Sequence, residues 1–273
     1  MAVDSLPTDS DEYADPFCWR MRELLEALAA GELSPEAVES RLRGYVTSEA
    51  GRLDTARTQR AGVPEAILAT GKTAAEVSTL VETSLEGTGR AIVTRADPTV
   101  TAALEQQYAE EPEMSVSVDD RAQTVVVRSA DFENPGLDAT VGIVTAGTSD
   151  AMPAGEAATI LREMGATVER IDDIGVASLD RTLDQVPLLR EQDILIVAAG
   201  REGALPTVLA GLVDVPIIGL PLSTGYGHGG EGRAALSGML QSCTAMSVVN
   251  IDAGFTAGVQ AGLIARQFDK IRE

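Results

Sequence analysis

The residues with the most reactive chemistry lie in glycine-rich segments of the second half of the chain. Glu202 lies between Gly200 and Gly203, and Cys243 comes shortly before a run of Val and Ile residues. A carboxylate can act as a general base, and a cysteine thiolate can bond transiently to an electron-poor carbon. The ordinary alternatives are a glutamate that stabilises a helix N-terminus and a cysteine that fills the core as a small hydrophobe.

Two more loops have the composition of a nucleotide site. The first holds Gly147, Thr148, Ser149 and Asp150, whose backbone N–H groups can approach a phosphate while the carboxylate meets a ribose hydroxyl or a metal. An ordinary capped turn explains it equally well. The second spans residues 223–232 and includes five glycines and the single histidine, His228. Its glycine content indicates a loop that a ligand or another backbone approaches closely, and His228 fits a loop residue better than a general base.

These loops follow strands of a predicted parallel sheet. Short runs rich in Val and Ile alternate with helix-like stretches, which favours an α/β fold of three layers with helices on both faces of the sheet. Loops that follow parallel strands meet at one edge, where such folds bind ligands. The predicted strands are 141–145, 167–171, 193–198, 216–220 and 247–251, and the predicted helices are 153–164, 203–212, 231–242 and 255–268.

The first half of the chain has a different rhythm and predicts a small α+β domain over residues 17–135, before the second domain at 136–273. Residues 1–16 are acidic and polar, which predicts a disordered tail. The predicted elements are helices at 17–28, 35–46, 73–86 and 98–109, strands at 66–69 and 91–94, and a hairpin formed by 115–118 and 124–128.

The charge balance excludes two classes of partner. The chain has 42 acidic and 21 basic residues, for a net charge of −21. Such a surface repels nucleic acid and anionic membranes, and no stretch of apolar residues is long enough to span a bilayer. Acid excess with only two lysines, Lys72 and Lys270, predicts a halophilic protein. Two distant cysteines and no signal peptide predict a cytoplasmic location.

Several motifs together resemble the LarB family of nickel-pincer cofactor biosynthesis. They include GTSD at 147–150, DDIGVA at 172–177, GYG at 225–227, MLQSC at 239–243 and VVNIDAGF at 248–255. The C-terminal half is similar to the PurE family of aminoimidazole ribonucleotide (AIR) carboxylases, which implies a flavodoxin-like fold. Upstream, residues 54–73 match a further LarB pattern that PurE proteins lack, with Asp54, Arg57, Arg60, Glu65 and Lys72 among its members.

The resemblance implies a reaction. LarB proteins carboxylate nicotinic acid adenine dinucleotide with CO2 or bicarbonate and hydrolyse its phosphoanhydride to release AMP. The product is pyridinium-3,5-biscarboxylic acid mononucleotide. Carried over by motif, Cys243 is the nucleophile that adds to the pyridinium ring and Glu202 is the base that removes the ring proton. Neither biotin nor ATP is expected.

The resemblance also assigns binding roles. Residues predicted to surround the nucleotide are Gly147, Thr148, Ser149, Asp150, Gly200, Gly203, Ser223, Gly225, Tyr226 and Gly227. Arg57, Arg60 and Lys72 are candidates for phosphate or carboxylate contacts, and Asp150 and Asp252 are candidates for Mg²⁺. The family implies a homo-oligomer of high order, with an octamer as one candidate. The Ala- and Gly-rich stretch 254–267 would permit the close packing this needs.

Some positions depart from the family pattern. Arg201 stands where Met is usual, and Asp180 stands where the family has a histidine that PurE enzymes use. Ala253 and Leu222 replace a usual Asn and Thr. Two alternatives therefore stay open. One is an AIR carboxylase or mutase of purine biosynthesis, which the missing histidine disfavours. The other is a non-catalytic nucleotide-binding module.

Overall fold

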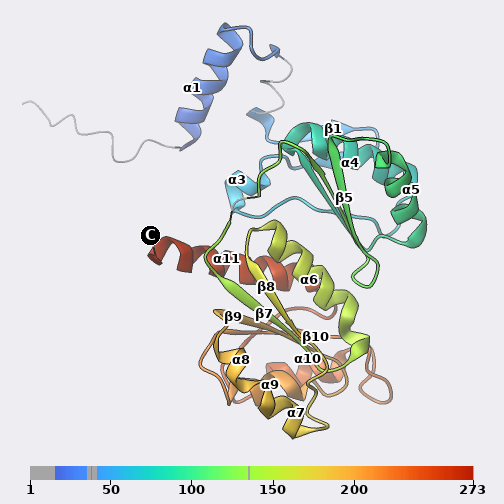
Figure 1. Cartoon of the computed structure of the whole chain (residues 1–273), viewed down its shortest axis with the longest axis vertical. Helices are drawn as coiled ribbons and strands as arrows, with labels where there is room; N and C mark the ends of the chain where they lie inside the picture. Colours follow the sequence, from blue (N-terminus) through green and yellow to red (C-terminus); the bar gives the residue numbers. More distant parts are fainter. Residues whose placement is uncertain (1–15, 36–37, 39–41, 135, 273) are drawn as a thin grey trace, which may run out of the picture.

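The computed structural model describes residues 16–35, 38, 42–134 and 136–272. Figure 1 shows a smaller N-terminal part above a larger C-terminal α/β part. The predicted tail at 1–16 lies outside the described residues except for Pro16, where the first helix begins. No helix in the described ranges is long and apolar enough to cross a membrane.

The C-terminal part contains a five-stranded parallel sheet, as the strand–helix alternation predicts. Its order, β8-β7-β9-β10-β11, is that of a flavodoxin-like doubly wound fold, and the order in which strands are added reverses between β7 and β9, which are parallel. The strands are β7 (Thr140–Thr145), β8 (Thr167–Ile171), β9 (Ile194–Ala199), β10 (Ile217–Pro221) and β11 (Ser247–Val248). β11 is shorter than predicted, because pairing with β10 is limited to two residues.

Helices cover both faces of this sheet. A core rich in alanine lies under α6 (Ala151–Glu163) and α11 (Gly254–Arg272). A second core with more leucine lies under α9 (Ala204–Ala210) and α10 (Arg233–Leu240) on the other face. Helices α7 and α8 were not predicted, because each has only five or six residues and little periodicity. The helices on this second face are α7 (Leu179–Asp184), α8 (Val186–Arg190), α9 (Ala204–Ala210) and α10 (Arg233–Leu240).

Three glycines of α11, spaced four residues apart, set how closely it packs on α6. A Cβ atom at Gly254 would lie 2.1 Å from the carbonyl oxygen of Pro153, and one at Gly258 would lie 2.8 Å from that of Ala157. A Cβ at Gly262 would lie 2.5 Å from Met164 Cε. These close approaches need glycine, so the small-residue stretch packs within the chain and does not support the predicted oligomer.

The N-terminal part is the predicted small α+β domain with a four-stranded sheet of order β3-β4-β6-β5. A capping box formed by Thr73 and Glu76 begins α4, which ends at Gly89 rather than at the predicted Gly87. The predicted helix at 35–46 lies partly outside the described residues, and Val46 begins a strand instead. The elements are α1 (Pro16–Ala29), β1 (Val46–Ser48), β2 (Gly51–Leu53), α3 (Arg57–Ala61), β3 (Ile67–Leu68), α4 (Ala74–Thr88), β4 (Arg90–Thr94), α5 (Pro98–Tyr108), β5 (Met114–Asp119) and β6 (Thr124–Ser129).

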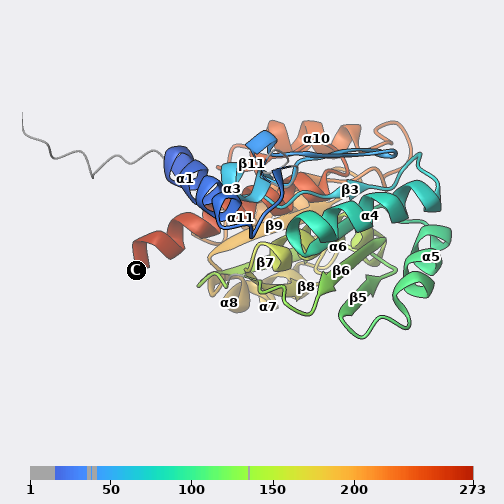
Figure 2. The ribbon, with the colours of Figure 1, turned by 90° about the horizontal axis from the view of Figure 1, so that it is seen from above.

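The two parts meet on α6 and α11, which lie between the two sheets in Figure 1. Figure 2, seen from above, shows β6 beside α6. The apolar contact joins Ile92 and Val126 of the N-terminal sheet to Ile160 and Met164, with α11 residues packed against them. Burial of such side chains stabilises the contact by about 25 cal/mol per Å² of apolar surface.

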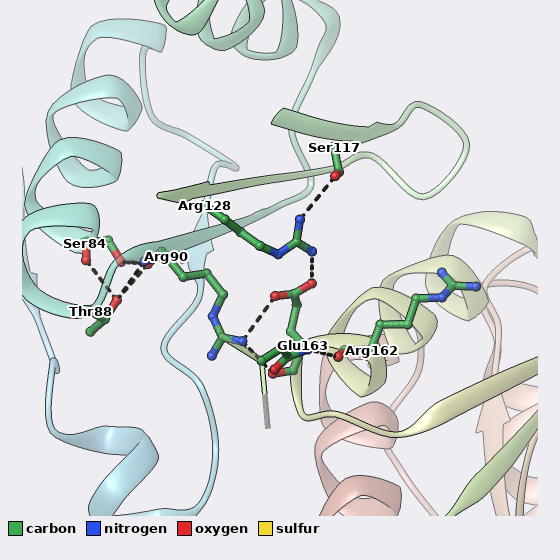
Figure 3. A network of polar contacts seen from close by, with 8 residues as sticks. Ser84, Thr88, Arg90, Ser117, Arg128, Arg162 and Glu163 are labelled. Atoms are coloured by element: carbon green, nitrogen blue, oxygen red, sulfur yellow. Dashed lines mark hydrogen bonds and ion pairs between the residues drawn. The ribbon is translucent and has the colours of Figure 1, made fainter. Parts of the chain in front are cut away.

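A buried ion pair closes one end of this interface. In Figure 3, Arg90 and Arg128 of the N-terminal sheet both point at Glu163, which ends α6. The Arg90 Nη1 atom lies 2.6 Å from the Glu163 carbonyl oxygen and 3.2 Å from its Oε2, and Arg128 pairs with the other carboxylate oxygen. Burial lowers the pKa of Arg90 despite the neighbouring carboxylate.

Candidate active site

A cavity of about 590 Å³ opens at the carboxyl ends of β7 and β9, where the strand order reverses. Open α/β folds bind their ligands at this kind of position. The cavity brings together several residues proposed for the nucleotide site. Its lining consists of Ala146, Gly147, Ser149, Asp150, Gly175, Val176, Ala177, Ala199, Gly200, Arg201, Glu202, Ala204, Leu205, Thr224 and Tyr226.

Asp150 organises the loop after β7 from within. Its carboxylate accepts hydrogen bonds from the Gly147 N–H at 2.9 Å and from the hydroxyls of Ser149 and Thr224 at 3.2 and 3.3 Å. The residue is 3% exposed, and burial raises the pKa of its carboxyl group. Because both oxygens are engaged, this arrangement does not favour the ribose or metal role predicted for Asp150. The short helix η1 (Thr148–Asp150) leaves Thr148 exposed beside it.

The loops after β9 and β10 touch each other, which explains two of their glycines. A Cβ at Gly200 would lie 2.4 Å from Thr224 Oγ1, and one at Gly225 would lie 2.9 Å from the Arg201 nitrogen. Thr224 was missed by sequence reasoning, because nothing in its spacing shows that it reaches Asp150. The contact joins the three loops into one wall of the cavity.

Glu202 and Cys243 are not placed together. Glu202 is exposed at the end of β9 and lines the cavity. Cys243 is an exposed free cysteine between the end of α10 and the start of β11, and it is not among the residues that line the cavity. Its neighbour Ser242 hydrogen-bonds with the Thr207 hydroxyl of α9 at 3.0 Å, and neither of these residues lines the cavity.

The three basic residues predicted to meet the substrate lie outside this cavity and have partners of their own. Arg57 pairs with Glu65 at 2.8 Å, and Lys72 donates to the Leu68 carbonyl oxygen at 2.7 Å. Arg60 pairs with Asp54, and this hydrogen bond raises the pKa of the Arg60 guanidinium. These three basic side chains therefore bind partners within the same segment, residues 54–72.

Asp252 links the N-terminal domain to the cavity loops. Its Oδ1 atom accepts from the Ser223 N–H at 2.9 Å, and its carbonyl oxygen accepts from Arg95 Nη2 at 2.7 Å. Arg95 also lies 3.7 Å from Glu156, which is buried in α6 and accepts from the Phe255 N–H at 3.0 Å. Sequence reasoning missed Arg95 and Glu156, since neither lies in a motif. This chain of contacts fixes the start of the glycine-rich loop.

These contacts border a second cavity of about 420 Å³ at the domain boundary, which Arg57, Arg95, Glu156 and Asp252 line in part. Its lining contains two arginines and two carboxylates. Across the described ranges, no group of three or more His, Cys, Asp or Glu side chains is placed to hold a metal ion.

The remaining candidates lie outside the cavity lining. Gly203 begins α9, and its Cβ would lie 2.7 Å from the Ala235 carbonyl oxygen, so it serves helix packing. Gly227 and His228 lie in the exposed part of the glycine-rich loop, outside the cavity lining. Asp180 is exposed in α7, and its neighbour Arg181 pairs with Asp173 at 2.8 Å.

Comparison with known proteins gives the family. Residues 140–273 match the model of AIR carboxylase, and residues 45–129 match that of the LarB/PurE-like N-terminal domain. An uncharacterized protein of Methanocaldococcus jannaschii is 36% identical over 256 residues, covering 92% of this chain and 98% of its own.

Among solved structures, PurE of Treponema denticola matches 49% of this chain and 94% of its own, at 17% identity and a TM-score of 0.36. A point variant of a PurE protein from the same organism matches to the same extent at 18% identity. The two family models cover both halves of the chain, and the archaeal relative spans nearly all of it. The chain therefore belongs to the LarB family, with a PurE-like domain of the carboxylase type as its C-terminal half.

Proposed function

We propose that this protein carboxylates C5 of the pyridinium ring of nicotinic acid adenine dinucleotide and hydrolyses the phosphoanhydride to release AMP. The observation that carries the proposal is the cavity at the β7–β9 edge, where the GTSD loop and Glu202 meet in a chain of the LarB family. The product would be pyridinium-3,5-biscarboxylic acid mononucleotide, the precursor of a nickel-pincer cofactor.

The chemistry explains why a thiol and a carboxylate are both needed. A pyridinium ring is electron-poor, so its C5 cannot attack CO2 directly. Addition of a thiolate at C4 turns the ring into a dihydropyridine, in which C5 is an enamine carbon that attacks CO2. A base then removes the C5 proton, and the electrons of the C5–H bond restore the C5=C6 double bond. The nitrogen lone pair then expels the thiolate, which leaves with the electrons of the C4–S bond, and the pyridinium ring is restored. The ring supplies the electrons, so neither biotin nor ATP is needed.

Glu202 suits the base, because it is exposed to the cavity and its backbone is held by α10. A Cβ at Gly238 of that helix would lie 2.5 Å from the Glu202 carbonyl oxygen, so α10 packs directly against the backbone of Glu202. Asp150 would act by holding the loop that faces the nucleotide. No step is assigned to a metal here: the carboxylates of Asp150 and Asp252 each accept internal hydrogen bonds, and Mg²⁺ stays a prediction.

Cys243 would reach a cavity in an oligomer. Its exposed thiol lies outside the lining of the cavity in its own chain, so we propose that it enters the cavity of a neighbouring copy. This makes the predicted homo-oligomer a requirement of the reaction. An exposed cysteine is also accessible to a bulky substrate.

The direct test incubates the protein with the dinucleotide and bicarbonate in high salt, with and without Mg²⁺, and follows both products by mass spectrometry. Cys243→Ala should abolish carboxylation, whereas Cys18→Ala, which removes the other cysteine, should not. Glu202→Gln should slow carboxylation about 10²- to 10⁴-fold. Release of no AMP and no dicarboxylated product by the wild type would refute the proposal.

The shared site has its own test. Cys243→Ala and Glu202→Gln are each inactive if the roles are right, and a mixture of the two, unfolded and refolded together, should regain part of the activity. Refolding each variant alone is the matched control. If the mixture stays inactive although it reassembles, both residues serve the same cavity of one chain.

AIR carboxylation is the second candidate, favoured by the family match of residues 140–273. Asp180 in place of the histidine used by PurE enzymes counts against it. Turnover of aminoimidazole ribonucleotide with CO2, at a rate above that on the dinucleotide, would establish it instead. Tight binding of the dinucleotide without any turnover would favour a non-catalytic module.

A further inference from the structure

The candidate cavity has one cationic side chain in its described lining. Three of its lining residues are acidic or basic: Asp150, Arg201 and Glu202. Two of these are acids, and the whole chain carries a net charge of −21. A substrate with phosphate and carboxylate groups would therefore meet a repulsive field unless a cation at the cavity offsets it.

Arg201 is held in a defined position by Tyr226. Its guanidinium carbon lies 4.2 Å from the centroid of the Tyr226 ring, and its Nη2 donates to the Tyr226 hydroxyl at 2.6 Å. Stacking of this kind restricts a long side chain at an exposed site. The backbone of Arg201 has a φ of 50°, a conformation that non-glycine residues adopt when their surroundings fix it. Gly225, packed against the Arg201 backbone, provides that fixing.

Most of the N–H donors of the Arg201 guanidinium remain available to a ligand. In the described part of the chain, no carboxylate forms an ion pair with it, in contrast to Arg57, Arg60 and Arg181. A guanidinium has five N–H donors in a planar fork, and the contact with Tyr226 uses one of them. The remaining donors can form paired, charge-assisted hydrogen bonds with an oxyanion.

We propose that Arg201, stacked on Tyr226, is the anchor of the cavity for the diphosphate of a dinucleotide. This deepens the proposed function and rests on it for the substrate. The diphosphate carries more charge than the single nicotinate carboxylate, so a lone cation gains most by binding a phosphoryl oxygen. Arg201 thereby takes the role that the sequence pattern assigned to Arg57, Arg60 and Lys72.

Isothermal titration tests the anchor without any turnover. The dinucleotide is titrated into wild type, Arg201→Met and Arg201→Lys in bicarbonate-free buffer at high salt, with product formation monitored in parallel. Arg201→Met should weaken binding about 10- to 100-fold, the value of a charge-assisted pair, and Arg201→Lys should weaken it less. Arg233→Met is the matched control: Arg233 is exposed at the start of α10, pairs with Glu231 and lies outside the cavity lining.

Competition separates the two anionic groups of the dinucleotide. Pyrophosphate and nicotinate are each tested for displacement of the dinucleotide from wild type and from Arg201→Met. We expect pyrophosphate to lose its effect in the variant and nicotinate to keep whatever effect it has. Loss of nicotinate competition alone would overturn the assignment to phosphate.

The remaining outcomes of the titration distinguish failure of the anchor from failure of the proposed function. Binding by Arg201→Met within twofold of wild type would refute the anchor, as would a wild type that binds neither the dinucleotide nor pyrophosphate. If the wild type binds through Arg201 but forms no carboxylated product, the proposed function fails and the anchor stands. If Arg201→Met forms product with an unchanged KM, the proposed function stands and the anchor fails.

Discussion

Glu156 and Glu163 of α6 differ in what their networks reach. They lie seven residues apart, so about two helical turns place them on the same face, and they are 2% and 3% exposed. Each meets arginine from the N-terminal domain. The Glu163 network reaches Arg90, Arg128 and Ser117 of the N-terminal sheet (Figure 3), whereas the Glu156 network continues through Arg95 and Asp252 to the loop that lines the cavity.

The two ends of the domain interface therefore differ in what they stabilise: one holds the domains together and the other positions a cavity loop. At the Glu163 end, two arginines and one carboxylate hold the domains together, and none of these residues lines the active-site cavity. At the Glu156 end, one arginine shares its contacts between a side chain and a backbone carbonyl. We expect stability to depend on the first end and activity on the second.

The largest effect is expected for Arg95→Met. Loss of its bond to the Asp252 carbonyl frees the loop that begins at Ser223, and small misplacements in a site cost about 10²-fold in rate. We therefore expect kcat/KM to fall about 10- to 100-fold, with partial rescue in Arg95→Lys. Steady-state kinetics on the dinucleotide measure this. Arg128→Met, which breaks the other end, is the control and should leave kcat/KM nearly unchanged.

Glu163→Ala should have the largest effect on stability. Removal of the carboxylate leaves Arg90 buried without its counter-charge, which costs about 3–5 kcal/mol in the free energy of unfolding. Denaturant unfolding at fixed salt measures the loss. A loss below about 1 kcal/mol would mean that solvent reaches this end of the interface and that the two glutamates do not differ.

Glu156→Gln should change how stability depends on pH. Burial raises the pKa of Glu156 above its ordinary value of 4.5, so the folded state holds its proton at pH values where the unfolded state has lost it. Stability of the wild type therefore falls as pH rises from the ordinary value through the raised one, and the glutamine variant should lack this part of the slope. Unfolding curves measured from about pH 4 to pH 8 give the comparison. Asp150, whose pKa is raised by burial too, should leave a residual slope in both proteins.

The smallest effect is expected where an ion pair belongs to neither network. Arg181 and Asp173 form an exposed pair at 2.8 Å, and such pairs contribute about 0–1 kcal/mol. Arg181→Met should therefore shift the free energy of unfolding by no more than about 0.5 kcal/mol. A larger loss would show that surface ion pairs matter here as much as the buried ones.

Much of the fold follows from the sequence, because runs of Val and Ile with Gly-rich punctuation mark buried strands and the loops after them. The same regularity places GTSD and Glu202 at one sheet edge. The partners of individual side chains are harder to predict. Spacing alone does not show that Asp150 accepts a hydrogen bond from its own loop or that Arg57 pairs with Glu65. Glu156 and Glu163 look like solvent-facing helix residues until a second domain covers them. Arg201 appears as a departure from a pattern, and only the structure shows that it stacks on Tyr226 at the cavity.

The close packing of α11 on α6 has a consequence for how the chain folds. These helices are separated in the sequence by β8, β9, β10 and β11, and they are pressed together at three glycines. The N-terminal sheet rests on both, through Ile92 and Val126 above Val259 and Leu263. The N-terminal domain is synthesised first, but the face of its sheet around Ile92 and Val126 is fully covered only after α11 has been synthesised. Such long-range closure is slow and leaves apolar strands exposed meanwhile, which makes chaperone dependence an expected trait of this protein during synthesis.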